Sequence, residues 1–313
     1  MAKTLVLGAD GFIGYHLTMG LLEAGHSVRA FSRMRDGKAT NLPQERANLE
    51  LFPGDFFNRE DLDRALDGVD YVFHFVSTTN PAISAKDPLL DIRTNMRMSV
   101  ELFQLCASHK VKRVIFPSTG GAIYGRDAER AFTEEDLTEP ISPYAIGKLA
   151  IEGYQRFFKQ VHDLDYLTLR ISNPFGERQN VVGSQGVIPI FMNLIKQGLP
   201  LNVFGDGSTV RDYISVGDLT KAIVRSFDQP AKHRLYNLGS GTSLSINELI
   251  AVLENTMGKK AQINYHPARP ADTRRVVLDV SRFESEFGKV ASTPFEEAVR
   301  ATWKFVEQRK DPK

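Results

Sequence analysis

Short apolar runs typical of strands recur along the first 171 residues, and amphipathic helical patterns separate them. The apolar runs occupy residues 4–7, 28–31, 49–52, 71–76, 113–116 and 167–171. The helical patterns lie at about residues 12–24, 59–66, 89–109 and 143–158. Strands that alternate with helices in this way predict an α/β fold with a doubly wound parallel sheet covered on both faces.

The pattern changes after residue 173, where the strand–helix alternation stops. Helices are expected at residues 187–197, 216–227 and 246–256, and short strands at 236–238 and 263–265. We therefore expect two domains, residues 1–173 and residues 174–308, followed by a loose tail at 309–313. The second, smaller α/β domain is expected to lie over the carboxyl edge of the sheet.

Composition narrows the class of protein. The 313 residues are 42% hydrophobic and 25% charged, with a formal net charge of +1, so no charge excess points to nucleic acid or to a membrane surface. The single cysteine, Cys106, excludes an internal disulfide, and its apolar helical setting indicates an inert buried thiol. With no signal pattern and no apolar run near the roughly 18 residues of a membrane span, we expect a cytoplasmic protein.

Three glycines follow the first predicted strand at intervals of three residues: Gly8, Gly11 and Gly14, with Phe12 and Ile13 between the last two. This spacing at a strand–helix junction is that of a dinucleotide-binding turn, in which glycines permit a tight turn and a close approach of the pyrophosphate. The alternative is an ordinary glycine-rich turn. Its place at the first such junction of a doubly wound chain favours nucleotide binding.

The end of the second predicted strand carries no acidic residue. An NAD enzyme usually places one here to hold the adenosine ribose, whereas this chain has Ser32 and Arg33. Serine can hydrogen-bond a ribose hydroxyl, and arginine can pair with a 2′-phosphate. Taken alone the turn favours NADP, unless it is only a solvated basic turn.

Tyr144 and Lys148 are four residues apart in a predicted helix, so their side chains share one face. A tyrosine hydroxyl has a pKa of about 10 and moves protons at neutral pH only if positive charge stabilises its phenolate. Lysine one turn away supplies such a charge. The spacing is common by chance, so other motifs in the chain are needed to identify the two residues as a catalytic pair.

Several further motifs follow one another in order, and with them nearly the whole chain resembles the extended short-chain dehydrogenase/reductase superfamily. The match is to its nucleotide-sugar epimerase/dehydratase branch, with a Rossmann-type first domain that binds the dinucleotide and a second that binds the nucleotide sugar. The motifs are Gly8-x-x-Gly11-x-x-Gly14, Gly54-Asp55, His74-Phe75-Val76-Ser77, Asn95, residues 118–125, Tyr144-x-x-x-Lys148, residues 173–176, residues 211–213 and residues 269–272.

The resemblance implies a role for each matching position. Thr119, Tyr144 and Lys148 match the catalytic residues: a hydroxyl that bonds the reacting sugar hydroxyl, the general acid/base, and the residue that holds the nicotinamide ribose. The implied cofactor-binding set is Gly8, Gly11, Phe12, Ile13, Gly14, Ser32, Arg33, Asp55, Phe56, Phe75, Val76, Ser77, Asn95, Tyr144 and Lys148. The implied substrate-binding set is Thr79, Thr119, Asn173, Val187, Arg211, Arg269, Asp272 and Val276. Asn95 and Asn173 could instead cap turns, and Arg211 could pair with Asp212 on the surface.

Departures from the family pattern narrow the subclass. Dehydratases follow the catalytic threonine with Asp-Glu, and decarboxylating relatives keep a Glu, whereas Thr119 precedes Gly120 and Gly121. No acid and base then stand ready for elimination, which leaves an epimerase or a reductase. Val276 falls where galactose-type 4-epimerases have a Tyr or a smaller residue, and valine suggests a pocket that takes an N-acetyl group.

The sequence therefore predicts a C4 epimerase of a UDP-hexose or UDP-N-acetylhexosamine, with tightly bound NAD, no metal, and a part in making polysaccharide precursors. An NADPH-dependent 4-keto-sugar reductase is the alternative, and a non-catalytic nucleotide sensor is the alternative from another class. A homodimer is expected through the helices at residues 95–106 and 144–158. The apolar residues expected to supply its surface are Met96, Val100, Phe103, Phe157 and Phe158.

Overall fold

The computed structural model describes residues 1–34, 38–125, 127–183, 185–269 and 273–309. They form two compact units, each built from separate stretches of chain. Unit 1 comprises residues 1–123, 140–170 and 220–236, and unit 2 comprises residues 124–139, 171–219 and those from 237 onward. Residues 220–236 thus belong with unit 1, although they follow the boundary expected at residue 173. The division into two domains stays a prediction.

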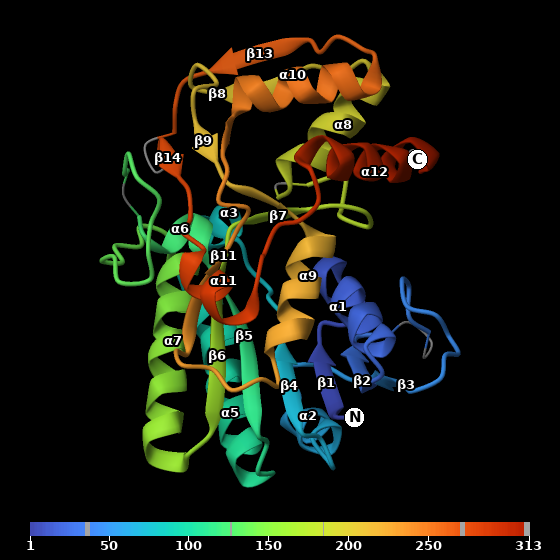
Figure 1. Cartoon of the computed structure of the whole chain (residues 1–313), viewed down its shortest axis with the longest axis vertical. Helices are drawn as coiled ribbons and strands as arrows, with labels where there is room; N and C mark the ends of the chain where they lie inside the picture. Colours follow the sequence, from blue (N-terminus) through green and yellow to red (C-terminus); the bar gives the residue numbers. More distant parts are fainter. Residues whose placement is uncertain (35–37, 126, 184, 270–272, 310–313) are drawn as a thin grey trace. The chain divides into compact units, whose positions relative to one another are not determined.

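A seven-stranded sheet organises unit 1, in the order β11-β6-β5-β4-β1-β2-β3 (Figure 1). Its strands are β1 (Lys3–Leu7), β2 (Ser27–Ser32), β3 (Leu49–Pro53), β4 (Tyr71–His74), β5 (Arg113–Thr119), β6 (Asp165–Ile171) and β11 (Leu235–Leu238). The registered pairs from β3 through β1 to β5 are all parallel. The doubly wound sheet expected from the alternating pattern is confirmed. Its seventh strand, β11, was expected in the second domain.

The side chains of the central strand β4 alternate between the two faces of the sheet. On one face, Tyr71 and Phe73 pack their rings 5.0 and 5.2 Å from that of Phe227. On the other face, Val72 joins the large apolar cluster under α2 (Arg59–Ala65), α5 (Arg97–Ser108) and α7 (Pro143–His162). Covering both faces explains why this strand reads as a continuous apolar run.

Helix α7 begins and ends at residues suited to those positions. Ser142 caps its amino end, its Oγ accepting from the Ala145 N–H at 3.3 Å, and Pro143 takes the first turn. Asp163 closes the other end in the left-handed conformation, with φ of 54°. The twenty-residue helix that results carries Tyr144 near its start and Lys148 one turn later.

The long helix expected at residues 89–109 is interrupted. It consists of α4 (Pro88–Asp91), a π-helical turn η1 (Ile92–Met96) and α5. The buried polar side chains of Asp91 and Asn95 flank and occupy this turn. Hydrophobic periodicity could not predict it, because a single π turn leaves the pattern before and after it almost unchanged.

The described part of unit 1 contains two further short helices and two longer ones, α1 and α9, that pack against each other. They are α1 (Phe12–Glu23), α3 (Pro81–Lys86), α6 (Gly120–Ile123) and most of α9 (Val216–Ser226). A Cβ on Gly20 of α1 would lie 3.4 Å from Val224 Cγ2 of α9, so these two helices pack closely.

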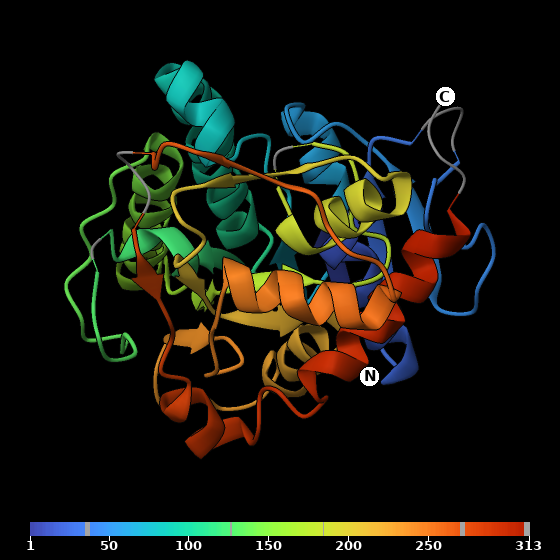
Figure 2. The same ribbon diagram turned by 90° about the horizontal axis from the view of Figure 1, so that it is seen from above.

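Unit 2 is built from three small sheets and a helical cluster. Its strands are β7 (Asn173–Phe175), β8 (Leu201–Phe204), β9 (Val210–Arg211), β10 (Tyr213–Ser215), β12 (Leu244–Ser245), β13 (Ile263–His266) and β14 (Arg275–Val276). Its helices are α8 (Val187–Gln197), α10 (Ile246–Met257), α11 (Ser281–Phe287) and α12 (Phe295–Gln308). Helices α8, α10 and α12 pack together around a second apolar core, as Figures 1 and 2 show.

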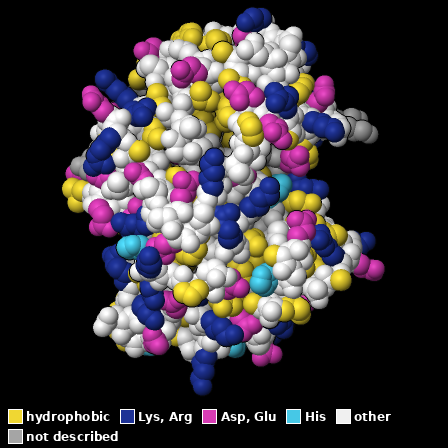
Figure 3. Space-filling view, in the orientation of Figure 1, with side chains coloured by type: hydrophobic (Ala, Val, Ile, Leu, Met, Phe, Trp, Pro, Cys, Tyr) yellow, Lys and Arg dark blue, Asp and Glu magenta, His cyan; other side chains and the backbone are white. Residues whose placement is uncertain are grey.

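The surface and the helices bear on two sequence expectations. Lys and Arg side chains are interspersed with Asp and Glu over the face seen in Figure 3, without a large patch of one sign. Within the described ranges, no helix is both long enough and apolar enough to span a bilayer. Cys106 is buried, and burial raises the pKa of its thiol far above the usual range, as expected for an inert cysteine.

Candidate active site

The glycine turn lies between β1 and α1, where backbone packs on backbone. Gly8 has a φ of 79°, and a Cβ there would lie 2.8 Å from the Phe75 carbonyl oxygen. A Cβ on Gly14 would lie only 2.1 Å from the Gly8 carbonyl oxygen. Both positions therefore require glycine, for the turn and for the contact of the first helix with it.

The amino end of α1 fits a bound pyrophosphate. Gly11 is its N-cap and makes no side-chain cap, and the first turn contains no acidic residue. The backbone N–H groups at this end, around Phe12 and Ile13, are thus left for an outside acceptor, and the helix dipole favours an anion there. The residues present fit the diphosphate of a dinucleotide.

Asp10, inside the glycine turn, would repel a pyrophosphate if its carboxylate faced it. Instead the carboxylate accepts from three backbone N–H groups, those of Thr40, Asn41 and Leu42, at 2.8, 2.7 and 3.1 Å. These bonds also anchor the chain that follows β2 beside the turn. This contact could not be predicted from the sequence, because its partners are about thirty residues apart and nothing in either stretch marks them as a pair.

The other residues predicted to bind the cofactor follow the carboxyl ends of neighbouring parallel strands. Ser32 ends β2 and Arg33 is exposed just beyond it, while Phe75, Val76 and Ser77 follow β4. In a parallel α/β sheet this edge is where ligands bind. The structure therefore brings these separate motifs to one edge of the sheet.

Asp55 and Phe56, after β3, differ in exposure. Asp55 is exposed, and its Oδ1 accepts from the Phe57 N–H at 3.0 Å. Phe56 is buried in the core of unit 1, with its ring 5.2 Å from that of His74. Its ring is thus not available to an adenine, and the solvent-facing groups here are Asp55 and Phe57.

Tyr144 and Lys148 share one face of α7, as their spacing predicts. The Lys148 Nζ donates to the Pro117 carbonyl oxygen at 2.8 Å and lies 5.8 Å from the centre of the Tyr144 ring. Thr119 ends the same strand, β5, two residues after Pro117. The strand and the helix thereby bring the three predicted catalytic residues into one region of unit 1.

The charges of this region suit a cofactor-dependent site. Burial and, to a smaller extent, the negative charge of Asp91 raise the pKa of Tyr144 to about 12. Burial lowers the pKa of Lys148 to about 8, although Asp91 and Glu152 oppose that shift. In the protein by itself Tyr144 is therefore neutral at pH 7, and a lower pKa of its hydroxyl requires further positive charge beside it.

A buried ion pair holds the catalytic helix against the sheet. Glu152, one turn after Lys148 on α7, accepts from the Ser118 Oγ at 2.6 Å, and it accepts from Arg170 Nε and a terminal guanidinium nitrogen at 3.1 and 2.9 Å. Both charged side chains are almost fully buried. Because Ser118 precedes Thr119, the pair also fixes the end of β5 beside the catalytic helix.

Asn95 and Thr79 belong to a second buried network. The Asn95 Oδ1 accepts from the Thr78 N–H at 3.0 Å, and its Nδ2 donates to Thr79 Oγ1 at 2.7 Å and to Asp91 Oδ1 at 2.8 Å. Thr79 is buried, and its hydroxyl donates to Asp91. These side chains shape the loop after β4, and in this structure their polar groups are occupied within the protein.

Unit 2 brings three of the predicted substrate-binding residues onto adjoining strands. Asn173 on β7 pairs in register with Tyr213 on β10, and Arg211 on β9 pairs with Val276 on β14. The Asn173 Nδ2 donates to the Asp212 carbonyl oxygen at 2.8 Å, which ties the two strand pairs together. These residues are up to a hundred positions apart in sequence, and the structure places them on neighbouring strands.

The other residues predicted to bind the substrate differ in exposure. Val187 is the first residue of α8, and Val276 is buried. Arg269 is exposed, with its guanidinium carbon 3.6 Å from the centre of the Phe204 ring. Asp212 is buried and accepts from the Ser240 N–H at 2.8 Å, so it is not the surface partner considered for Arg211. Asp272 lies outside the described residues.

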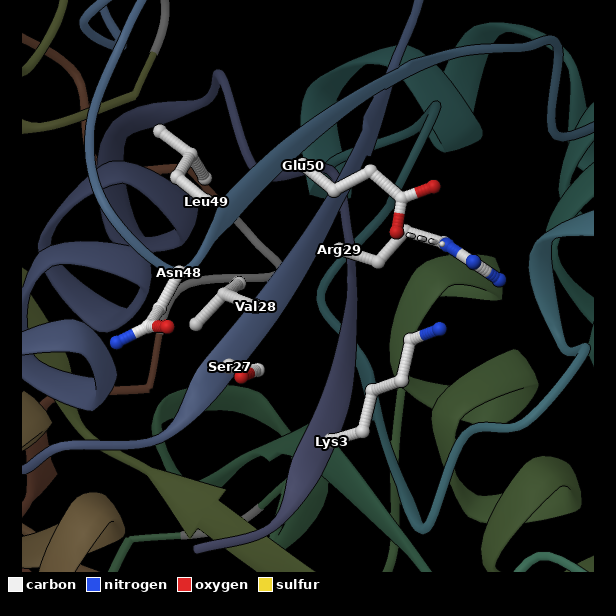
Figure 4. A pocket seen from close by; sticks show the side chains of 7 residues that line it. All are labelled: Lys3, Ser27, Val28, Arg29, Asn48, Leu49 and Glu50. Atoms are coloured by element: carbon white, nitrogen blue, oxygen red, sulfur yellow. Dashed lines mark hydrogen bonds and ion pairs between the residues drawn. The ribbon is translucent and has the colours of Figure 1, made fainter.

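One cavity lies at the other edge of the sheet. A cavity of about 290 Å³ opens at the amino end of β2 (Figure 4), the edge opposite to the one where parallel sheets bind ligands. It is lined by Lys3, Ser27, Val28, Arg29, Asn48, Leu49 and Glu50. Over the stretches of chain that are described, no three His, Cys, Asp or Glu side chains gather as a metal site would require.

Known proteins with similar sequences identify the family of this chain. A sequence model described as "NAD dependent epimerase/dehydratase family" matches residues 4–239. The chain is 32% identical to the UDP-glucose 4-epimerase of Mycolicibacterium smegmatis over 97% of its own length and 98% of the relative's.

The chain belongs to the NAD-dependent epimerase/dehydratase family.

Solved structures of family members agree over nearly the full length. The UDP-glucose 4-epimerase of Thermotoga maritima with UDP-glucose has a TM-score of 0.91 at 32% identity, covering 98% of this chain and 99% of that one. The Thermus thermophilus UDP-glucose 4-epimerase in complex with NAD has a TM-score of 0.90 at 31% identity, with the same coverage. The UDP-N-acetylglucosamine 4-epimerase of Methanobrevibacter ruminantium has a TM-score of 0.88 at 31% identity, again with 98% and 99% covered.

The family also contains reductases. The dTDP-4-dehydro-6-deoxyglucose reductase of Escherichia coli is 30% identical over 91% of each chain. Family membership therefore agrees with the resemblance inferred from the motifs and with NAD as the cofactor, while it leaves both hydride-transfer reactions represented among the relatives.

Proposed function

We propose that this protein is a nucleotide-sugar C4 epimerase that works on a UDP-hexose or a UDP-N-acetylhexosamine. The observation that carries the proposal is the Thr119, Tyr144 and Lys148 set at the carboxyl edge of a sheet whose first turn fits a dinucleotide. Relatives and solved neighbours that cover the whole chain are 4-epimerases of UDP-glucose and UDP-N-acetylglucosamine.

Each residue of the set would have a separate role in the epimerisation. Tyr144 takes the proton from the sugar 4-hydroxyl and later returns it, while the Thr119 hydroxyl holds that oxygen in place. NAD bound at the glycine turn would supply the acceptor and donor for the C4 hydride. Lys148 holds the nicotinamide ribose and adds positive charge. Asn173 and Arg211 hold the nucleotide diphosphate.

The residues after Thr119 limit the reaction to hydride and proton transfer. Gly120 and Gly121 begin the short helix α6 and carry no side chain that could act as acid or base. Elimination of water from the sugar requires an acid and a base. Relatives that decarboxylate their substrate have a glutamate after the catalytic threonine. Epimerisation requires neither, because the hydride returns to the opposite face of the same carbon.

A 4-keto-sugar reductase is the second candidate function. The specific observations that favour it are the exposed Arg33 after β2, without an acidic neighbour at the strand end, and the 30% identical reductase of Escherichia coli. The nucleotide-sensing alternative has no such support, because the Thr119, Tyr144 and Lys148 set is complete.

Retained cofactor distinguishes the two reactions. The purified protein is expected to carry NAD, released by acid and identified by mass, and to interconvert UDP-glucose and UDP-galactose without added coenzyme. A protein that comes pure without cofactor, produces no epimer and oxidises NADPH in the presence of a 4-keto sugar would be a reductase. A panel that adds UDP-N-acetylglucosamine identifies the preferred sugar.

We propose also that the protein forms a homodimer through α7 and the neighbouring α4–η1 segment. Exposed apolar side chains line one side of α7, with Ile146, Phe157 and Val161 each 50–57% exposed, and Leu89 and Ile92 are similarly exposed. Two residues expected at this surface are not there, because Phe103 and Phe158 are buried in the core of unit 1, while Met96 and Val100 pack partly against it.

A charged substitution tests this interface. Phe157→Glu is expected to convert a dimer into a monomer in light scattering at micromolar concentration, while Phe57→Glu, at a site after β3 that is 42% exposed against 50% for Phe157, leaves the dimer intact. A wild-type monomer ends the dimer proposal.

We propose further that the protein has a cytoplasmic role in supplying polysaccharide precursors. The nucleotide-sugar chemistry and the single reduced cysteine support this role.

A further inference from the structure

Asp91 is a buried carboxylate for which the proposed reaction has no use. It is the last residue of α4, directly before the π-helical turn, and it is only 2% exposed. Its Oδ1 accepts from the Asn95 Nδ2 at 2.8 Å and from the Thr79 hydroxyl. A buried carboxylate is costly unless its surroundings compensate its charge, and neither of these partners is charged.

The second oxygen of Asp91 reaches the catalytic helix. A Cβ built on Gly147 of α7 would lie 1.9 Å from Asp91 Oδ2 and 3.0 Å from its Cγ. Gly147 precedes Lys148 and follows Tyr144 by three residues, so the carboxylate lies against the backbone between the two catalytic side chains. The absence of a side chain at Gly147 is what leaves room for it.

The charged groups around this position favour one partner. The Asp91 charge, at the end of α4, raises the pKa of both Tyr144 and Lys148 on α7, and Glu152 on α7 raises that of Lys148. His74, the last residue of β4, is buried, and burial together with the Lys148 charge lowers its pKa to about 3. His74 is therefore neutral at pH 7. Lys148, the residue that follows Gly147, is thus a cation whose pKa the Asp91 charge raises.

We propose that Asp91 is a positioning residue, the buried counter-charge that keeps Lys148 protonated, and that Gly147 is required because it admits this carboxylate to the catalytic helix. The catalytic role of Asp91 rests on the proposed epimerase function. The packing of Asp91 against Gly147 does not depend on that function. Through Thr79 and Asn95, the same carboxylate ties the loop after β4 to that helix.

The packing part is tested by a thermal-stability cycle that needs no activity. Gly147→Ala is expected to lower the melting temperature by roughly 3–6 °C, because its methyl group collides with the Asp91 carboxylate. In the Asp91→Ala background the same change is expected to cost nothing or to stabilise, because the space is free and alanine favours helix. A Gly147→Ala cost that is equal in both backgrounds overturns the proposal.

The charge part is tested by the pH profile of epimerisation. Asp91→Asn removes a negative charge that raises two pKa values, so both the acid limb (Tyr144) and the basic limb (Lys148) are expected to move to lower pH by roughly 1 unit. Glu101→Gln, which removes a carboxylate from an exposed ion pair on α5, serves as the control and is expected to move neither limb. A residue that only supported the structure would lower the rate at all pH values without moving the limbs.

The two failures are distinguishable. If the wild-type protein interconverts no UDP-sugar, the proposed function fails, and the thermal cycle still judges the packing of Asp91 against Gly147. If the wild type is active and Asp91→Asn keeps both limbs in place, the counter-charge is refuted while the epimerase assignment stands. Should Asp91→Asn not fold, Asp91→Ala with Gly147→Ala supplies the pH profile, and unmoved limbs in that variant refute the counter-charge equally.

Discussion

Removing the Glu152 carboxylate should be among the most destabilising single changes in unit 1. In Glu152→Ala, the Arg170 guanidinium loses two hydrogen bonds, at 3.1 and 2.9 Å, and Ser118 loses one at 2.6 Å. Both members of the ion pair are no more than 5% exposed, so the buried guanidinium loses the carboxylate that compensates its charge. Breaking such a pair costs about 3–5 kcal/mol of the free energy of unfolding.

Urea denaturation followed by circular dichroism measures that cost. With an m-value of about 3 kcal/mol per molar urea, the midpoint should fall by roughly 1 to 1.7 M. Glu101→Ala, which breaks an exposed ion pair with Arg97, is the matched control and should change stability by about 0.5 kcal/mol or less. Replacing both partners, with Glu152→Leu and Arg170→Met, should recover much of the loss, because no buried charge then remains. A single Glu152→Ala variant as stable as the control would refute the reasoning.

Other predictions concern the cofactor turn, the acid/base residue and the sugar pocket. Gly14→Ala should abolish retention of NAD, because its methyl group collides with the Gly8 carbonyl oxygen, whereas Gly20→Ala on the same helix meets nothing nearer than 3.4 Å and should retain it. Tyr144→Phe should lose at least a hundredfold in turnover while retaining NAD, and equal turnover in Tyr144→Phe and the exposed control Tyr154→Phe would exclude Tyr144 as the acid/base. Val276→Tyr should reduce turnover of N-acetylated UDP-sugars relative to the unacetylated ones, and unchanged ratios would end that hypothesis.

The sequence predicted the parts of this protein that depend on local pattern. The strands and most of the longer helices of unit 1 follow from hydrophobic runs and periodicity, and the start of α7 follows from Ser142 and Pro143. The Tyr144 and Lys148 face follows from helical spacing alone, and the glycine turn from its position after β1. In each case the residues that make the feature are near one another in the chain.

The parts that escaped prediction depend on distant partners. Nothing near Asp10 indicates that it anchors the backbone of residues 40–42, and nothing near Asp91 indicates that it lies against Gly147. Phe103 and Phe158 were expected at a surface, but both are buried, because an apolar position on a helix does not tell which neighbour covers it. The strand at residues 236–238 was expected, but its place in the main sheet was not, because the chain passes through unit 2 before β11 pairs with β6.

The proposed reaction is tested most directly by following the hydrogen at C4. UDP-glucose deuterated at C4 is incubated with the purified protein without added coenzyme, and the UDP-galactose formed is analysed by mass spectrometry and NMR. If Tyr144 moves only the hydroxyl proton and the hydride returns to the carbon it left, the product carries deuterium at C4 in the inverted configuration. Product with hydrogen from solvent at C4, or no C4 epimer from any UDP-sugar tested, would contradict the assignment.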